Sequence, residues 1–381
     1  MTKRRKTAFL SPNIFIFGFF FVILRANIRV PMIVKYKETA LSELYSNMHE
    51  VVRLGEIARI IPGYYSKYGS IFKLTDCKLK NNLRIEGYSK ELQRDVILER
   101  DAVRALITAN DVDDFIDANY MEYTTYLITA DHHDEDFKYC YPLTAKYLQE
   151  CFSGNNKGSA LDIETIIRPS IREAMDKKKL ILSVAGDISH AMSDSEANVV
   201  PTVGSYLCTF PGEDWQTIVA YMAILNSRTF SYMLYHRSQE SDLIGSGRKS
   251  LLEDLPVPRY TSEFIILNYL SECLLYLSKP YLPPISKRIS NERIGYYLTK
   301  ILDMVVYELY FPEYVRERNL NAIEYIDSAP FLQSSIVDDD LILQTYQWFQ
   351  RPENVIRQMI EVLDTRSPEL LYKIQKFNPD E

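Results

Sequence analysis

The chain has 381 residues, of which 46% are hydrophobic and 25% charged, so it can bury a core and is not a disordered protein. A formal net charge of −7 excludes a histone-like protein that binds nucleic acid by charge alone. The five cysteines are widely spaced and form no C-x-x-C motif, which supports neither a disulfide framework nor a zinc knuckle. We therefore expect a reducing, cytoplasmic location.

The N-terminal leader, residues 1–50, is basic. Through Lys80 the chain holds 14 Lys/Arg against 5 Asp/Glu, a balance of +9, and the remainder holds 30 against 46, a balance of −16. An apolar run follows KRRK, as in a signal peptide. This run, residues 14–24, is short of the roughly 20 residues that span a bilayer. We predict no membrane partner, and a membrane-tethered interaction protein is kept as a third interpretation.

Residues 51–260 are predicted to form the next unit, which opens with an apolar segment, residues 52–74. This segment contains the sequence YYSKYG, in which tyrosines alternate with a lysine. Such a surface suits base stacking and phosphate contact. Tyr64, Tyr65 and Lys67 are therefore candidate nucleic-acid contacts, and a tyrosine-rich strand edge is the alternative.

The middle of this unit contains an acidic insert and a His-carboxylate run. We predict a partly helical insert at residues 101–119 and a strand at residues 123–130, because YTTYLITA is β-branched and aromatic. The run DHHDED, residues 131–136, has donor types that a divalent metal takes in DNA cleavage. Consecutive side chains point in different directions, which favours a solvated loop. A diverged metal-dependent endonuclease that uses this run stays open as the alternative function.

Helices are predicted for residues 142–152 and 163–175. The second helix runs into Lys177, Lys178 and Lys179, followed by a strand of sequence LILSVA. The three lysines are candidate DNA-binding residues.

Residues 225–258 combine three features. A broadly buried helix ends in a polar loop, predicted for residues 236–250, whose glycines free the backbone before a cationic pair. LPVP closes the stretch, and its prolines predict an extended edge strand or polyproline segment. A cationic loop on a buried helix suits a phosphate backbone, although it also describes an ordinary surface loop. The candidate contacts from this stretch are Arg228, His236, Arg237, Arg248 and Lys249.

Three motifs in this order resemble one protein family. The last motif has LNS, an aromatic-rich helix, a glycine-containing polar loop and L-x-x-L-P-x-P, which is similar to the end of the TaqI-like C-terminal specificity domain. That domain is the target recognition module of adenine-specific DNA methyltransferases and fused type II restriction-modification enzymes. Residues 177–210 look like the family's strand pair. Residues 52–74 resemble the LG-x-IA-x-I-x-x-G motif with which such domains begin. The matching residues of the last motif are Leu225, Asn226, Ser227, Gly245, Gly247, Leu252, Leu255, Pro256 and Pro258.

The resemblance implies an α+β protein that recognises double-stranded DNA in a restriction-modification system. The chain has no N-P-P-Y motif for a flipped adenine, no glycine-bearing cofactor strand and no credible nuclease motif. We therefore expect no catalytic residue, cofactor or metal in this chain. S-adenosylmethionine and Mg²⁺ would belong to a separate methyltransferase or endonuclease chain.

Residues 261–381 are predicted to form an all-helical C-terminal domain. Long amphipathic helices are expected at residues 263–277 and 294–310, and further helices up to residue 377. Because an acidic helical surface binds DNA poorly, we expect this domain to contact the catalytic partner.

Overall fold

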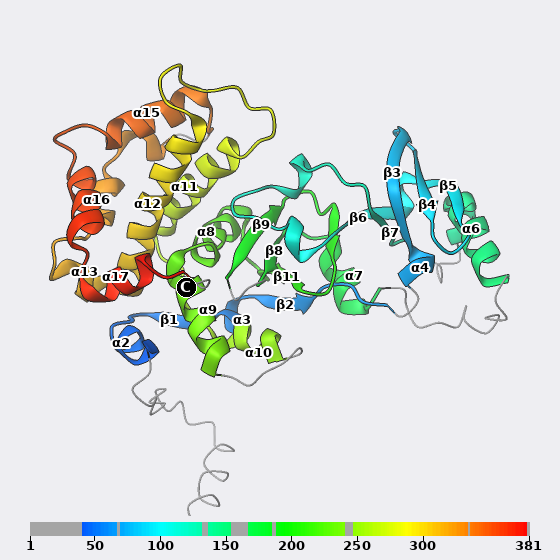
Figure 1. Ribbon diagram of the computed structural model, residues 1–381, viewed down its shortest axis with the longest axis horizontal. Helices are drawn as coiled ribbons and strands as arrows, with labels where there is room; N and C mark the ends of the chain where they lie inside the picture. Colours follow the sequence, from blue (N-terminus) through cyan, green and yellow to red (C-terminus); the bar gives the residue numbers. More distant parts are fainter. Residues whose placement is uncertain are drawn as a thin grey trace, which may run out of the picture. The chain divides into compact units, whose positions relative to one another are not determined.

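The computed structural model contains two compact units, Met1–Ser42 and Glu43–Glu381. The apolar run at residues 14–24 lies outside the described residues. Among the described residues, no helix is long and apolar enough to cross a membrane. The description below concerns the second unit, whose mixture of sheets and helices confirms the predicted α+β class (Figure 1). The described residues are 40–66, 69–131, 136–153, 167–184, 188–240, 247–333 and 336–378.

A four-stranded antiparallel sheet forms the centre of this unit. Every residue of β8 and β11 is buried, because helices or the second sheet cover both faces. The helix α8 (Trp215–Leu225) contacts β8 and β9 on one face, and α7 (Pro169–Met175) contacts β2 and β11 on the other. The strand order is β2 (Arg59–Pro62), β11 (Ser205–Thr209), β8 (Lys179–Ser183) and β9 (His190–Asp194).

A six-stranded sheet shares its core with the first, since Ile181 and Leu207 pack in one cluster with Leu74 and Ile85. Its strands are antiparallel except for the pair β10 and β6. The order is β10 (Val199–Pro201), β6 (Val103–Ile107), β7 (Tyr126–Ile128), β3 (Lys73–Asn81), β4 (Arg84–Ser89) and β5 (Arg94–Glu99).

The prediction of a partly helical insert at residues 101–119 was wrong in its main element. This segment contains the strand β6, and its helical content is limited to short 3-10 turns. Val103, Ala105 and Ile107 are buried in the shared core, and β6 pairs in parallel with β10, which lies almost a hundred residues further along the sequence. Long-range pairing therefore overrode the acidic composition of the segment.

The predicted extended element at LPVP is confirmed. The strand β12 (Pro256–Pro258) pairs with β1 (Val51–Arg53) in a two-stranded antiparallel sheet, where prolines are tolerated because both strands are edges. Tyr310 Oη donates to the carbonyl oxygen of Pro256 at 3.0 Å. The start and the end of the predicted recognition unit therefore lie side by side, while the domain boundaries stay a prediction.

The loop predicted for residues 236–250 was wrong at both ends. The helix α9 (Arg228–Glu240) continues past His236, and α10 (Gly247–Asp254) begins at the second glycine. Ion pairs at helical spacing, such as Lys249 with Glu253, favour helix here. Residues 241–246 lie outside the described residues.

The C-terminal helices follow the predicted pattern. Asp338 caps α15 (Asp339–Phe349) by accepting from Leu341 N at 2.8 Å. The helix α11 (Phe264–Leu277) packs along α8, which joins the helices to the central sheet. The described helices are α11 (Phe264–Leu277), α12 (Asn291–Tyr310), α13 (Pro312–Arg316), α14 (Ile323–Asp327), α15 (Asp339–Phe349), α16 (Val355–Arg366) and α17 (Glu369–Gln375).

The contact between α8 and α11 gives a first testable prediction. Tyr221 stacks on Phe210 and meets Phe264 edge-on, with 5.1 Å between ring centroids in both pairs. Tyr221→Ala should lower the free energy of unfolding by about 3–5 kcal/mol, measured by urea denaturation. The exposed Tyr139 gives the control, since Tyr139→Ala should change it by less than about 0.5 kcal/mol. Equal effects would show that the ring stack does not hold the two helices together.

Candidate nucleic-acid interface

The predicted contacts do not converge on one site. The register of the central sheet places Pro62 and Ser183 at one end and Arg59 and Leu180 at the other. Tyr64, Tyr65 and Arg248 therefore belong to the first end, whereas the lysines at 177–179 belong to the second. Arg228, His236 and Arg237 lie on α9.

The two adjacent tyrosines have different environments. Tyr65 is 66% exposed, which leaves its ring free to stack on a base. Tyr64 is buried, so it cannot serve as a stacking platform and is removed from the candidates. Lys67 lies outside the described residues.

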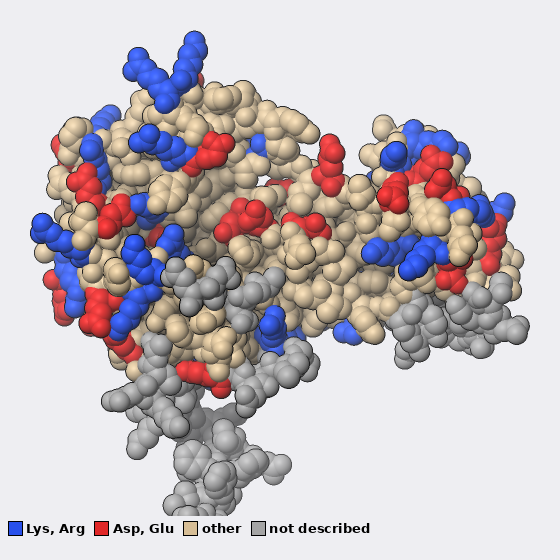
Figure 2. All heavy atoms as spheres, viewed as in Figure 1, with Lys and Arg blue, Asp and Glu red and all other residues tan. Residues whose placement is uncertain are grey.

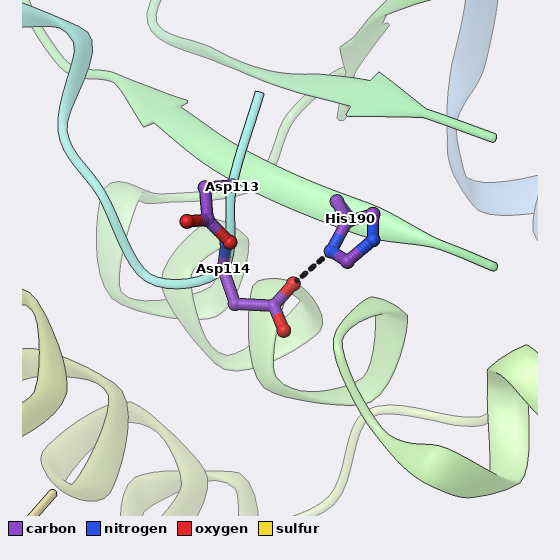
Figure 3. A group of neighbouring side chains, drawn as sticks. All are labelled: Asp113, Asp114 and His190. Carbon is purple, nitrogen blue, oxygen red and sulfur yellow. Dashed lines mark hydrogen bonds and ion pairs between the residues drawn. The ribbon is translucent and has the colours of Figure 1, made fainter. Parts of the chain in front are cut away.

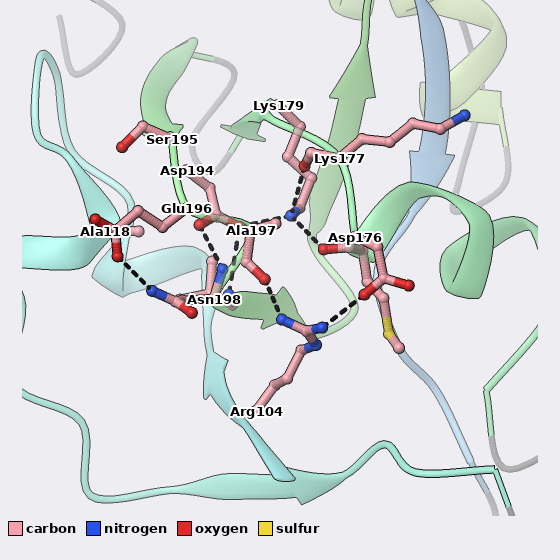
Figure 4. A network of polar contacts seen from close by, with 12 residues as sticks. Arg104, Ala118, Asp176, Lys177, Lys179, Asp194, Ser195, Glu196, Ala197 and Asn198 are labelled. Atoms are coloured by element: carbon pink, nitrogen blue, oxygen red, sulfur yellow. Dashed lines mark hydrogen bonds and ion pairs between the residues drawn. The ribbon is translucent and has the colours of Figure 1, made fainter. Parts of the chain in front are cut away.

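Lys179 was wrongly predicted to contact DNA. Its side chain is completely buried, and its ammonium group lies 2.6 Å from the carboxylate of Asp194, which is also fully buried (Figure 4). Lys179 Nζ also donates to the carbonyl oxygens of Met175 at 3.0 Å and Lys177 at 3.2 Å. Burial lowers the pKa of this lysine, and the Asp194 carboxylate opposes that shift. The pair belongs to the core.

The polar network around this pair connects the two large sheets (Figure 4). Asp194 accepts from the backbone nitrogen of Asn198 at 2.8 Å, which holds the turn that leads into β10. Arg104 of β6 donates to Asp176 at 2.6 Å and to the carbonyl oxygen of Ala197. Because its members bond to one another, we assign this network a structural role.

Lys177 and Lys178 are exposed, as predicted, but both have protein partners. Lys177 lies 3.2 Å from Glu173, which also pairs with Arg59, and Lys178 lies 5.5 Å from the centre of the Trp215 ring. Exposed contacts of this kind are weak. Both lysines stay candidates.

Each of the three candidates on α9 has a partner within the protein, Arg228 on another helix and the other two on α9 itself. Arg228 lies 3.7 Å from Asp303 on α12, and Arg237 lies 3.4 Å from Glu240. His236 packs against the ring of Tyr232, with centroids 4.4 Å apart. Burial lowers the pKa of His236, so its imidazole is neutral at neutral pH and adds no positive charge to the surface.

Arg248 and Lys249 lie in the first turn of α10 instead of a loop. Arg248 donates to the carbonyl oxygen of Val184 at 3.3 Å, and Lys249 pairs with Glu253. Arg248 is exposed and Lys249 is half-buried, so both stay candidate DNA contacts. Their side chains are less mobile than they would be in a flexible loop.

The run at residues 131–136 lies mostly outside the described residues. Its first residue, Asp131, lies 3.6 Å from Arg172.

Within the described ranges, Asp113, Asp114 and His190 are the one group of three possible metal ligands (Figure 3). Their ligand atoms all lie within 4.8 Å of one another. His190 Nδ1 is 3.0 Å from Asp114, and this bond raises the pKa of the imidazole. The contact joins the segment before Phe115 to β9.

A basic corner of the six-stranded sheet, residues 78–84, was missed by the sequence analysis. All seven residues are exposed, from the end of β3 through its turn to the first residue of β4. The strand β3 pairs with β7 only at Lys73 and Leu74, so its far half is an edge with β4 on one side. The signal in the sequence was KLKNNLR, seven residues without an acidic member in a chain of net negative charge.

The cations of the basic corner are largely unpaired. Lys80 lies 3.5 Å from Glu86, while Lys78 and Arg84 form no ion pair with any described residue. Figure 2 shows Lys and Arg side chains gathered over β3 and β4, with acidic groups beside them. Leu79 and Leu83 are 63% and 73% exposed, so the corner presents cationic and apolar groups together.

Comparison with known proteins gives several structural likenesses. The chain is similar to the Type IIL restriction-modification enzyme MmeI in complex with DNA, with a TM-score of 0.40 and 11% sequence identity. The match covers 78% of this chain and 36% of that one, so this chain spans about a third of its length. No family model and no curated protein matches the chain. At this level of similarity, function has to be inferred from the chain's own residues.

The buried pair gives a second prediction. Lys179→Met leaves the Asp194 carboxylate buried without its partner, so the free energy of unfolding should fall by about 3–5 kcal/mol in urea denaturation. Adding Asp194→Asn should recover part of the loss, because the amide removes the buried charge and its oxygen can still accept from the backbone nitrogen of Asn198. Lys178→Met is the control and should cost less than about 0.5 kcal/mol. A stable Lys179→Met protein that no longer binds DNA would instead restore the prediction of a DNA contact.

Proposed function

We propose that this chain recognises specific sequences in double-stranded DNA as part of a restriction-modification system. The observation that carries the proposal is the basic corner, where the exposed Lys78 and Lys80 stand on the open half of β3 and the exposed Arg84 begins the neighbouring β4. The ordered motifs of the TaqI-like specificity domain support it independently. Methyl transfer or cleavage would be supplied by a separate catalytic part with S-adenosylmethionine or Mg²⁺.

The shape and chemistry of the corner suit a DNA groove. Strands as well as helices can enter a groove. The three cations would contact phosphates, which fixes position without reading sequence. Asn82 in the turn carries an amide that can bond to adenine, and the exposed leucines can contact thymine methyl groups. A short corner therefore offers both kinds of contact.

The charge of the chain is consistent with local binding. With a net charge of −7, the chain as a whole repels DNA at long range, so binding would be concentrated where cations lack acidic partners. Among the earlier candidates, Tyr65, Lys177, Lys178, Arg248 and Lys249 are proposed as additional contacts. Residues 261–381 are proposed as the surface for the catalytic partner.

The test is a charge removal at the corner. Lys78→Ala combined with Arg84→Ala should weaken binding to a duplex of random sequence by about tenfold, because two phosphate contacts are lost. The slope of log affinity against log salt should become shallower by about 2. Fluorescence anisotropy over a salt series measures both quantities.

The matched control removes one lysine and one arginine from the loop between α11 and α12. Lys287→Ala with Arg288→Ala should leave affinity and salt slope within error, since both residues are exposed in the helical region. If the corner variant binds as tightly as the control but aggregates, its cations protect an open strand edge instead, and the proposal fails.

A further inference from the structure

Two carboxylates and one imidazole meet beside the edge strand β9 (Figure 3). Asp113 and Asp114 are adjacent in the segment after β6, and His190 begins β9, 76 positions after Asp114. Asp113 is exposed and the other two are half-buried, so an ion from solvent can reach the group. The set combines one nitrogen donor with two oxygen donors from separate segments, and it is therefore more than a run of acidic side chains.

The spacing of these donor atoms is close to that of ligands around one ion. Ligands that lie about 2.0–2.1 Å from a metal are about 2.9–3.3 Å apart in octahedral or tetrahedral geometry. His190 Nδ1 and Asp114 Oδ1 lie 3.0 Å apart, and all three ligand atoms lie within 4.8 Å of one another. Asp113 Oδ1 accepts from the backbone nitrogen of Asp114 at 2.8 Å, which leaves its second oxygen for an ion. Rotation of this exposed side chain closes the remaining distance.

The charges of the group favour a cation. Within the described ranges, Asp113 forms no ion pair and Asp114 pairs only with His190. The imidazole contributes at most one positive charge against the two carboxylates, so the group carries a net negative charge at neutral pH. Adjacent like charges repel each other, and a bound divalent ion would remove this repulsion.

The two segments that carry the donors are held in place by other contacts. The backbone nitrogen of Ser193 donates to the carbonyl oxygen of Ile116 at 2.8 Å, and Ser193 Oγ donates to Asp117 at 2.7 Å. In β9, the side chain of Asn226 bonds to both backbone groups of Ala191, at 2.6 and 2.9 Å. Because the donors stand on fixed segments, binding an ion requires little further ordering of the backbone.

We propose that Asp113, Asp114 and His190 bind one divalent transition-metal ion such as Zn²⁺. An imidazole nitrogen favours such ions over Mg²⁺ and Ca²⁺, which take oxygen ligands. Three protein ligands leave a position for water or for a group of a bound molecule. No sequence motif connects the two segments, which is why the sequence alone predicted no metal. The site is independent of the basic corner and of the DNA-binding proposal.

The experiment titrates Zn²⁺ into the full chain, freed of metal with a chelator, by isothermal titration calorimetry. Zn²⁺ should bind at least about tenfold more tightly than Mg²⁺ and should raise the melting temperature. Asp113→Asn should weaken Zn²⁺ binding at least about tenfold and remove the rise in melting temperature, since the loss of even an indirect contact to a metal ligand has an effect of this size. Asp327→Asn, an exposed change on α14, is the matched control and should alter neither quantity.

Absence of Zn²⁺ binding by the unaltered chain, or Mg²⁺ binding of equal strength, would overturn the proposal, and neither measurement needs a variant. A second variant, His132→Gln with His133→Gln, removes the imidazoles of the run at residues 131–136. If this variant loses Zn²⁺ while a folded Asp113→Asn protein binds it as tightly as the unaltered chain, the ion belongs to that run and the proposal fails. Circular dichroism of each variant confirms that the chain is folded.

Discussion

The buried pair of Lys179 and Asp194 is the constraint on which the arrangement of the two large sheets depends. Two full charges without solvent exposure are tolerated only when each is met by its partner and by further hydrogen bonds. The carbonyl oxygens at the end of α7 and the backbone nitrogens before β10 supply those bonds. The pair therefore fixes three chain segments at one point, from which β10 continues into the second sheet beside β6.

This arrangement leaves one end of the six-stranded sheet uncovered. The strand β7 pairs with β3 at only two residues, so the far half of β3 is an open edge. Open edges are a liability that proteins often protect with lysines. Here the edge also carries exposed leucines, a combination that protection alone does not require. The same exposure makes the corner available to a groove of DNA.

The fold could be predicted from the sequence where local chemistry decides it. Helical spacing in α12, the prolines of β12 and the apolar sequence of β8 all determine their elements directly. Lys179 shows where this reasoning ends, because Lys177, Lys178 and Lys179 are identical in type and adjacent. Of the three, only Lys179 is buried, because it is the first residue of β8, and which lysine occupies that position depends on the long-range pairing of β8 with β9. Composition cannot distinguish a charge in the core from its exposed neighbours.

The candidate site was harder to predict for the same reason. Glycines next to Arg248 indicated a flexible loop, yet ion pairs at helical spacing continue the helix there. Tyr64 and Tyr65 looked equivalent until the central sheet buried one of them. Conversely, residues 78–84 carry no known motif, and the open half of β3 follows from its short pairing with β7, which only the structure reveals.

The central claim, that the basic corner lies against double-stranded DNA, is tested most directly by photo-crosslinking. A benzophenone side chain replacing Leu83, which is 73% exposed in the turn, should crosslink to a duplex on irradiation. The same side chain replacing Tyr281, which is 94% exposed in the helical region, should not. Crosslinks from position 281 and none from position 83, with both proteins folded and bound to the duplex, would contradict the account.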